Sequence, residues 1–237
     1  MRDYHVVSFS GGKDSTAMLL HMLELDMPVD EIIFCDTGME FPAMYDHVDK
    51  VEAYIGRKIT RLKSDKTFEY YLFEYTPKKL AEQGLQGKGF PSAHIRWCTN
   101  YLKTSQIDKF LRKHKNAVQY IGIAADEPKR IKGKKYPLVE WGWTEADALQ
   151  YCYDKGFDWG GLYQHFNRVS CWCCPLQNLN SLRTLRHNFP DLWAKLLEWQ
   201  TRTWRKFRAD YSVQELEDKF AKEDEKNARY QQLLLDF

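Results

Sequence analysis

The sequence predicts an α/β protein with an open, mostly parallel sheet, followed by a helical C-terminal region. Short apolar, β-branched runs alternate with helical stretches through the first two thirds of the chain. This alternation is typical of βαβ units with right-handed crossovers. From Leu179 onward, apolar residues recur with helical spacing only. With 237 residues, 43% of them apolar and 15% aromatic, the chain is long enough for a sizeable core, and disorder is excluded.

The predicted strands are short and apolar, as buried strands of a parallel sheet are. They are Tyr4–Phe9, Glu31–Cys35, Ile59–Leu62 and Val118–Ala124. The predicted helices that follow or precede them are Ala17–Leu25, Phe41–Ile55, Tyr101–His114 and Thr144–Lys155. Thr144 is the expected N-cap of the last of these, with Asp147 in the first turn, where a carboxylate interacts favourably with the helix dipole. The glycine-containing segment Lys78–Pro91 is expected to be a mobile loop near a functional site.

The sequence of the C-terminal part predicts three helices, one of which carries a hydrophobic stripe. Leu182 and Leu185 mark the first, Pro190 opens the second over Asp191–Arg208, and Val213–Gln232 forms the third. The stripe that we expect in the core is formed by Trp193, Leu196, Leu197, Trp199 and Trp204. We divide the chain into an α/β domain over residues 1–150 and a second region over 151–237, which joins a cysteine-bearing junction to these helices.

Composition limits the classes of protein to consider. The 35 Lys and Arg residues nearly balance the 33 Asp and Glu residues, so net charge alone gives no argument for nucleic acid. No stretch approaches the roughly 20 apolar residues that span a bilayer, and the first residues lack the apolar region of a secretory signal. Six cysteines are too few for a disulfide scaffold. We expect a cytoplasmic protein without a membrane partner.

The turn Ser10-Gly-Gly-Lys-Asp-Ser15 lies directly between the first predicted strand and helix. Glycines let the backbone approach an anion closely, and the amides at a helix N-terminus attract negative charge. Lys13 adds a point charge, and the Ser10 and Ser15 hydroxyls add donors. An ordinary glycine-containing turn is the alternative, but six such residues between a strand and a helix favour a phosphate-binding site. The spacing is not that of a Walker A loop.

This turn resembles the PP-loop of the adenine nucleotide alpha-hydrolase superfamily, which includes ATP pyrophosphatases, ATP sulfurylase small subunits and PAPS reductases. Further segments resemble the PAPS-reductase-like branch in the expected order over residues 4–176. They are Cys35-Asp-Thr-Gly38 with Glu40-Phe-Pro42, Arg96-Trp-Cys-Thr99 with Lys103, Gly122–Glu127 with Arg130, Pro137-Leu138 with Trp141, Leu162-Tyr163, and Arg168 with Cys171–Pro175. Ala124 stands where the branch usually has an arginine.

The resemblance implies a Rossmann-like sheet that binds ATP or a related adenine nucleotide at its carboxyl edge. It also implies an enzyme that cleaves at the α-phosphate to activate an acceptor, with sulfur transfer as one such chemistry. The expected nucleotide-binding residues are Ser10, Gly11, Gly12, Lys13, Asp14, Ser15, Asp36, Thr37, Gly38, Gly122, Asp126 and Glu127.

Charge stabilisation is the expected basis of catalysis. Attack on the α-phosphate builds charge that loop amides, Lys13 and a Mg²⁺ ion would stabilise. The expected catalytic residues are Lys13, Asp14, Asp36 and Arg130. Asp14 either holds Mg²⁺ or caps the helix, Asp36 either contacts the nucleotide or forms a turn, and Arg130 either clamps a phosphate or is solvated.

Two other functions remain open at this point. One is a phosphoadenylyl-sulfate reductase. The resemblance disfavours it, because such reductases use a C-terminal cysteine for sulfite release and no cysteine follows Cys174. They also tend to lack the lysine of the loop, which is present here as Lys13. The other is a non-catalytic, nucleotide-sensing protein associated with DNA, which would use the loop only to bind.

The cysteines Cys171, Cys173 and Cys174 crowd together before Pro175, and two of them have CxxC spacing. With Cys98 they could hold a [4Fe-4S] cluster, or Zn²⁺ with help from His165 or His187. The alternative is buried thiols packed as small hydrophobic side chains. We assign Cys35 and Cys152 to core packing.

Two C-terminal features point to macromolecular partners. A local group of basic side chains either contacts nucleic acid through phosphates or is a solvated helix face. Its members are Arg183, Arg186, Arg202, Arg205, Lys206 and Arg208. The last six residues, Gln232–Phe237, resemble the Q-L-x-L-x-F peptide that docks on the bacterial sliding clamp. The alternative is a last helix whose apolar stripe folds back on the body.

Overall fold

The computed structural model describes residues 2–235, which fold into two compact units. The first unit is formed by Met1–Asp65 and Thr99–Cys171, and the second by Lys66–Cys98 and Trp172–Phe237. Each unit therefore combines two segments that are distant in sequence. The division at residue 150 remains a prediction, because compactness does not test which segments fold on their own.

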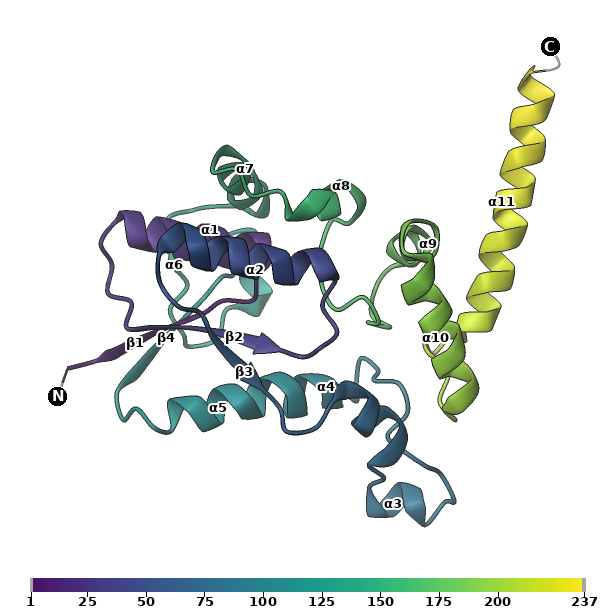
Figure 1. Ribbon diagram of the computed structural model, residues 1–237, viewed down its shortest axis with the longest axis horizontal. Coiled ribbons are helices and arrows are strands. Elements are labelled where there is room, and N and C mark those ends of the chain that lie inside the picture. Colours follow the sequence, from purple (N-terminus) through teal and green to yellow (C-terminus); the bar gives the residue numbers. More distant parts are fainter. Residues whose placement is uncertain (1, 236–237) are drawn as a thin grey trace. The chain divides into compact units, whose positions relative to one another are not determined.

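The first unit contains a four-stranded, all-parallel sheet in the order β3-β2-β1-β4 (Figure 1). Its strands are β1 (Tyr4–Ser8), β2 (Glu31–Asp36), β3 (Thr60–Lys63) and β4 (Ala117–Ile121). Val7 of β1 pairs with Ile32 on one side and with Tyr120 on the other, and it is fully buried. The strand order reverses between β1 and β4, which is where open α/β sheets bind ligands. The predicted parallel α/β sheet is confirmed.

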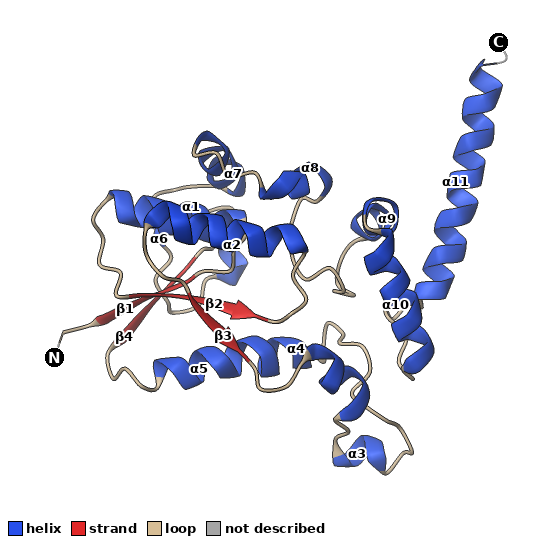
Figure 2. Ribbon diagram, in the orientation of Figure 1, coloured by secondary structure: helices blue, strands red, loops and turns tan. Residues whose placement is uncertain are grey.

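Helices cover both faces of this sheet (Figure 2). Helices α1 (Lys13–Glu24) and α2 (Pro42–Ile55) lie on one face, and α5 (Ser105–Leu111) lies on the other. Right-handed crossovers require this, because the chain moves outward from β1 to β3 and then returns past β1 to β4. Where the sequence predicts one helix over Tyr101–His114, a π-helical turn, η2 (Asn100–Thr104), leads into α5.

The first unit also contains several short helical elements. They are η3 (Pro128–Arg130), α6 (Pro137–Glu140), α7 (Glu145–Asp154), η4 (Trp159–Gly161) and α8 (Leu162–His165), and the three-residue α4 (Trp97–Thr99) ends at the start of the second segment of this unit. The predicted start of α7 is confirmed as a capping box. The Thr144 N–H donates to Asp147 Oδ2 at 2.8 Å, and the Asp147 N–H donates to Thr144 Oγ1 at 3.2 Å.

The second unit is helical, as the sequence predicts for the C-terminal region. It contains η1 (Tyr70–Glu74), α3 (Lys78–Ala81), α9 (Leu179–Asn188), α10 (Pro190–Arg202) and α11 (Val213–Leu235). The segment Lys78–Pro91, which the sequence predicts as a mobile loop, begins with the short helix α3 and continues as turns and loop that pack within the unit. Its mobility remains a prediction. A Cβ on Gly87 would lie 2.2 Å from the carbonyl oxygen of Leu72.

Two sequence expectations for these helices need correction. Helix α10 ends at Arg202 and not at Arg208, because Thr203 adopts an extended conformation. Trp204 therefore lies beyond the helix, with 39% of its surface exposed. Trp193, Leu196 and Trp199 of the predicted stripe are buried in the core. The end of the predicted clamp-binding peptide, Asp236 and Phe237, lies outside the described residues.

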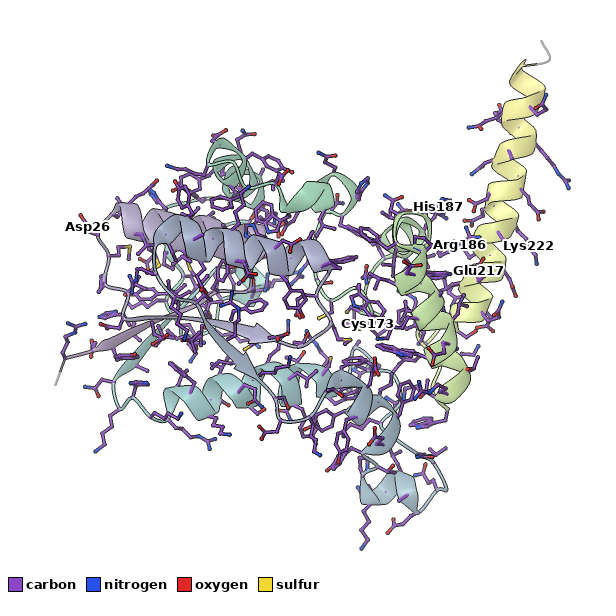
Figure 3. All side chains as sticks on the ribbon, viewed as in Figure 1. Asp26, Cys173, Arg186, His187, Glu217 and Lys222 are labelled. Atoms are coloured by element: carbon purple, nitrogen blue, oxygen red, sulfur yellow. The ribbon has the colours of Figure 1, made fainter. Side chains whose placement is uncertain are left out.

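Acidic residues of α11 neutralise much of the predicted basic surface. Figure 3 shows Arg186 of α9 directed toward Glu217 of α11. The two side chains form a hydrogen-bonded ion pair at 2.8 Å, and a second Arg186 nitrogen lies 2.6 Å from Asp224. The hydrogen bonds that Arg186 donates to Glu217, and then to Asp224, outweigh the effect of burial and raise the pKa of Arg186. Arg183 pairs with Glu223 in the same way.

Among the described helices, none combines the length and the apolar character that crossing a bilayer requires.

His47 of α2 is a buried histidine that supports the glycine-rich turn from behind. Its Nε2 atom lies 3.0 Å from Thr16 Oγ1, and its ring stacks on Trp159 at a centroid distance of 4.4 Å. Burial lowers the pKa of His47 from 6.5 to about 3. The folded protein therefore holds this ring neutral at a pH where the unfolded chain protonates it.

This depressed pKa predicts a loss of stability in acid. As the pH falls from about 6.5 to about 3, the unfolded state takes up a proton that the folded state refuses, so the free energy of unfolding decreases. The decrease is at most about 1.4 kcal/mol per pH unit from this group. In His47→Gln, the part of the pH dependence of the unfolding free energy that comes from this ring should disappear. His94→Gln, which removes an exposed histidine, should keep that pH dependence. Urea unfolding at a series of pH values measures both. Parallel curves for His47→Gln and the unaltered protein would contradict the assignment.

Candidate functional site

The turn between β1 and α1 is closed by its two serines. The Ser15 hydroxyl accepts a hydrogen bond from the Ser10 N–H at 3.1 Å and donates to the carbonyl of Gly12 at 3.0 Å. Gly11 has a φ of +78°, and a Cβ at this position would lie 2.6 Å from the sulfur of Met44. The left-handed backbone conformation therefore favours glycine at Gly11, whereas the Met44 side chain could shift to admit a Cβ.

Residues from much later in the chain hold this turn in place. Trp159 Nε1 donates to the carbonyl of Gly11 at 2.7 Å, and the Tyr163 hydroxyl accepts from the Lys13 N–H at 2.9 Å. The first turn of α1 also touches Gly122, which follows β4. A Cβ on Gly122 would lie 2.7 Å from both the nitrogen and the Cα of Ser15. The sequence gives no signal for Trp159, and the resemblance at Leu162-Tyr163 does not indicate that Tyr163 binds the turn. Both contacts join residues more than 140 positions apart along the chain.

The Lys13 ammonium group lies among carboxylates. Its Nζ atom is 3.1 Å from Asp14 and 3.2 Å from Glu145, and the side chain is almost completely buried. Burial raises the pKa of Asp14, and the positive charge of Lys13 opposes that rise. One oxygen from each of Asp14, Glu127 and Glu145 lies within 4.8 Å of the others.

These three carboxylates fit the predicted magnesium ion. Mg²⁺ prefers oxygen ligands, and protein carboxylates usually supply one or two of them. The three groups meet beside the first turn of α1, where the sequence predicts that the phosphates bind. Asp14 thus has the surroundings expected of a metal ligand and also pairs with Lys13.

A cleft of about 200 Å³ opens in front of the turn, next to Gly122 at the β1/β4 switch point. Four cationic side chains line it, together with two carboxylates, a thiol and several small or neutral residues. The lining residues are Ser10, Gly12, Lys13, Asp14, Glu40, Met44, Lys103, Gly122, Arg130, Tyr163, Arg168, Val169, Ser170 and Cys171. Positive charge at the carboxyl edge of a parallel sheet is the arrangement that an anionic ligand requires.

Glu40 is a buried carboxylate of this cleft and is not among the site residues predicted from the sequence. It is 8% exposed, it accepts from the Thr37 hydroxyl at 2.7 Å, and it lies 3.5 Å from Lys103 Nζ. The Tyr45 hydroxyl lies 3.1 Å from Glu40 and 3.0 Å from Asp36, so it links the two carboxylates. The sequence offers two signals for this pair: Thr37 and Glu40 are three residues apart, and both belong to the segment that resembles the PAPS-reductase-like branch.

Asp36 ends β2 just outside the cleft lining, and its carboxylate has three polar partners. Gly38 N–H donates to it at 2.9 Å, and Lys63 Nζ lies 3.2 Å away. Burial tends to raise the pKa of Asp36, but these interactions and the Tyr45 hydroxyl outweigh burial and lower the pKa. Asp36 is therefore ionised at neutral pH. The sequence predicts either a turn-forming residue or a nucleotide contact at this position, and an ionised carboxylate is compatible with both. The nucleotide roles of Asp36, Thr37, Gly38 and Asp126 remain predictions.

The predicted metal-binding cysteines belong to different units. Cys171 ends the first unit and lines the cleft, with its sulfur 3.7 Å from Glu40 and 3.8 Å from the Thr37 hydroxyl. Cys98, Cys173 and Cys174 belong to the second unit. Within the described part of that unit, no three His, Cys, Asp or Glu ligand atoms lie within 4.8 Å of one another. The cysteine metal site therefore remains a prediction.

Charges near Cys171 shift the titration of its neighbours. Interaction with the Cys171 thiolate, followed by Glu40, raises the pKa of Lys103 against the effect of burial. Burial raises the pKa of Cys35 to about 11, and Cys152 is fully buried with a raised pKa for the same reason. Core packing, as predicted, is confirmed for Cys152, while Cys35 is half-buried.

Fold and site together define an α/β protein with a glycine-containing turn and a cleft lined by cationic side chains at the switch point of a parallel sheet. The chain belongs to the phosphoadenosine phosphosulfate reductase domain family, whose model matches residues 4–177.

The chain is also similar to individual proteins. An uncharacterized protein of Methanocaldococcus jannaschii is 28% identical over 205 residues, which are 80% of this chain and 40% of that protein. The chain thus spans less than half the length of this relative. The adenosine 5'-phosphosulfate reductase of Geobacillus kaustophilus is 25% identical over 71% of this chain and 73% of its own. The phosphoadenylyl-sulfate reductase of Candida auris, in a phosphate complex, has a TM-score of 0.49 and 17% identity over 71% of this chain and 80% of that chain.

The contact at Gly122 predicts that Gly122→Ala disrupts the turn. Because the new Cβ would lie 2.7 Å from backbone atoms of Ser15, the turn or β4 must shift. We expect a stability loss of roughly 1–3 kcal/mol and weaker nucleotide binding. Thermal unfolding and isothermal titration with ATP measure these effects. Gly133→Ala is the matched control, because open space surrounds Gly133 and only its φ of +49° opposes a side chain. Nucleotide binding by Gly122→Ala at full affinity would contradict the prediction.

Proposed function

We propose that this protein binds ATP or a related adenine nucleotide at the turn and cleaves it at the α-phosphate to activate an acceptor. The observation that carries the proposal is the cleft in which Lys13, Lys103, Arg130 and Arg168 surround an anion-binding turn at the sheet's switch point. Membership in the family supports an adenine nucleotide as the ligand. Sulfur transfer to the acceptor is one chemistry consistent with that family.

The roles of the residues follow from their positions. The turn brings the Gly12 backbone and the N-terminal end of α1 to the phosphates, where they favour negative charge. Lys13, which pairs with Asp14 and Glu145 in this structure, can turn to a phosphate oxygen once those carboxylates have another cation. Arg130 and Arg168 also line the cleft and would stabilise the leaving pyrophosphate. Mg²⁺, held by Asp14, Glu127 and Glu145, would supply electrostatic stabilisation of phosphate oxygens.

A second candidate function is reduction of a sulfonucleotide. One observation favours it: the Cys171 thiol lines the same cleft as Lys13 and lies close to Glu40 and Lys103. Similarity to an adenosine 5'-phosphosulfate reductase also supports it. The two functions differ in their products. Incubation with ATP and candidate acceptors should release pyrophosphate in the first case, and incubation with a sulfonucleotide and a thiol reductant should release sulfite in the second.

Replacement of Lys13 tests the first function. We expect Lys13→Gln to lower the rate of pyrophosphate release roughly 10²–10³-fold, because one charged donor to the transition state is lost. The protein should remain folded, since glutamine keeps a polar group between Asp14 and Glu145. Pyrophosphate release, with mass spectrometry of every nucleotide product, measures the effect.

The matched control for this experiment is Lys109→Gln, which changes an exposed lysine of α5 outside the cleft. It should leave the rate unchanged. Full activity in Lys13→Gln, or equal losses in both variants, would refute the role of the turn.

We also propose that Cys98, Cys171, Cys173 and Cys174 bind a metal, either as a [4Fe-4S] cluster or as Zn²⁺. Protein purified without oxygen is expected to carry iron and acid-labile sulfide with visible absorbance in the first case, and zinc without colour in the second. Cys174→Ser should lower the bound metal several-fold, whereas Cys35→Ser should not. Active protein that contains neither metal would contradict this proposal.

A further inference from the structure

A second hollow, larger than the nucleotide cleft, lies wholly within the second unit. Its volume is about 880 Å³, and three loops border it: 91–95, 175–178 and 205–210. None of its lining residues belongs to the cleft described above. The apolar side chains of Ile95 and Leu176 line it and are 47% and 49% exposed. The hollow therefore offers both a large volume and an apolar wall, which are general properties of ligand sites.

The charges in this hollow are unbalanced. Three cationic side chains, Arg205, Lys206 and Arg208, face a single carboxylate, Asp210. Lys206 pairs with Glu215 at 2.9 Å, and Arg208 pairs with Asp210 at 2.9 Å. Their charges are thus already compensated by the protein.

Arg205 is the uncompensated cation. In the part of the chain that the structure describes, it forms no ion pair with a carboxylate, and its Nη1 atom donates only to the carbonyl of Phe90 at 3.3 Å. Burial lowers the pKa of Arg205, which is the effect of desolvating a cation that lacks a counter-charge. An anionic group bound beside Arg205 would offset this desolvation.

Arg205 also forms one half of a stacking platform. Its guanidinium group lies over the indole ring of Trp204, 4.6 Å from the ring centroid, and 39% of Trp204 is exposed. The indole N–H lies 3.4 Å from the carbonyl of Gly87. Gly89 allows the two loops to approach, because a Cβ there would lie 2.7 Å from the Cβ of Arg205. The loops on both sides thus hold the platform in place.

We propose that this hollow and the Trp204 ring, which adjoins it through Arg205, bind single-stranded nucleic acid, with a backbone phosphate at Arg205 and unpaired bases against Trp204 and the apolar wall. Exposed aromatic rings and guanidinium planes beside a cationic groove are the features that bind unstacked bases. A duplex keeps its bases paired and cannot stack them on the platform. An acidic peptide would satisfy the charge of Arg205 but would leave the exposed indole and the apolar wall unused. The proposal does not depend on the nucleotide chemistry of the first unit.

Fluorescence anisotropy with the full chain and labelled strands of about 12 nucleotides tests the proposal directly. At about 50 mM salt and without added nucleotide, a DNA or RNA single strand should bind more tightly than the corresponding duplex. Arg205→Gln and Trp204→Ala should each weaken binding roughly tenfold. Arg202→Gln is the matched control, because Arg202 is an exposed arginine of α10 that pairs with Glu198 outside the hollow. The affinity of Arg202→Gln for the single strands should equal that of the unaltered protein.

A second pair of variants keeps the test valid if Arg205→Gln or Trp204→Ala unfolds the protein. Ile95→Asp places a negative charge on the exposed wall of the hollow and should also weaken binding, whereas Leu25→Asp, at an equally exposed position in the first unit, should not. Circular dichroism confirms that each variant is folded. Three results would overturn the proposal: no binding of either single strand, equal affinity in Ile95→Asp and the unaltered protein, or tighter binding of a poly-glutamate peptide than of the strands.

Discussion

The contact between Gly122 and the first turn of α1 is the constraint on which the candidate site depends. The end of β4 approaches the backbone of Ser15 so closely that no side chain fits between them. This approach brings the loop after β4, with Glu127 and Arg130, to the turn that follows β1. Because the strand order reverses between β1 and β4, the connections that follow these two strands leave in opposite directions, and the cleft lies between them.

Around this contact, large side chains fix the turn from behind while charges face the cleft. Trp159 and Tyr163 bind backbone groups of the turn, and His47 packs behind Trp159 as a neutral ring. In front, Lys13 sits between two carboxylates whose charges would otherwise repel an anionic ligand. The aromatic side chains thus support the turn on one side, and the paired charges of Lys13 and its carboxylates lie on the side of the cleft. Rigid support of this kind holds donors where charge develops, without reorganisation at the moment of reaction.

The second unit shows how pairing within the protein decides which charges remain available. Six basic residues lie close together in sequence, yet Arg183 and Arg186 pair with acids of α11, and Lys206 and Arg208 pair with nearby carboxylates. Pairing with acids compensates the positive charges of these four side chains within the protein. Arg205 differs from them because its closest partners are an indole ring and a backbone carbonyl.

The sequence by itself determined the local parts of this protein. The four strands, the capping box at Thr144 and the turn Ser10–Ser15 follow from apolar periodicity and glycine positions, which act over a few residues. The order of the motifs also predicted the family correctly, because the model of that family matches residues 4–177. A helix end such as Arg202 was placed less accurately, because no proline or glycine marks it.

Only the tertiary structure decided which distant residues meet. Nothing near Lys13 in the sequence indicates that Glu145 pairs with it or that Tyr163 occupies its amide, since these contacts arise from how α7 and α8 pack on α1. The same holds for Glu40 beside Cys171, and for the position of Arg205 against Trp204 and Gly89. Local patterns encode secondary structure, whereas the charge balance of a site is set by side chains that the packing of the core brings together.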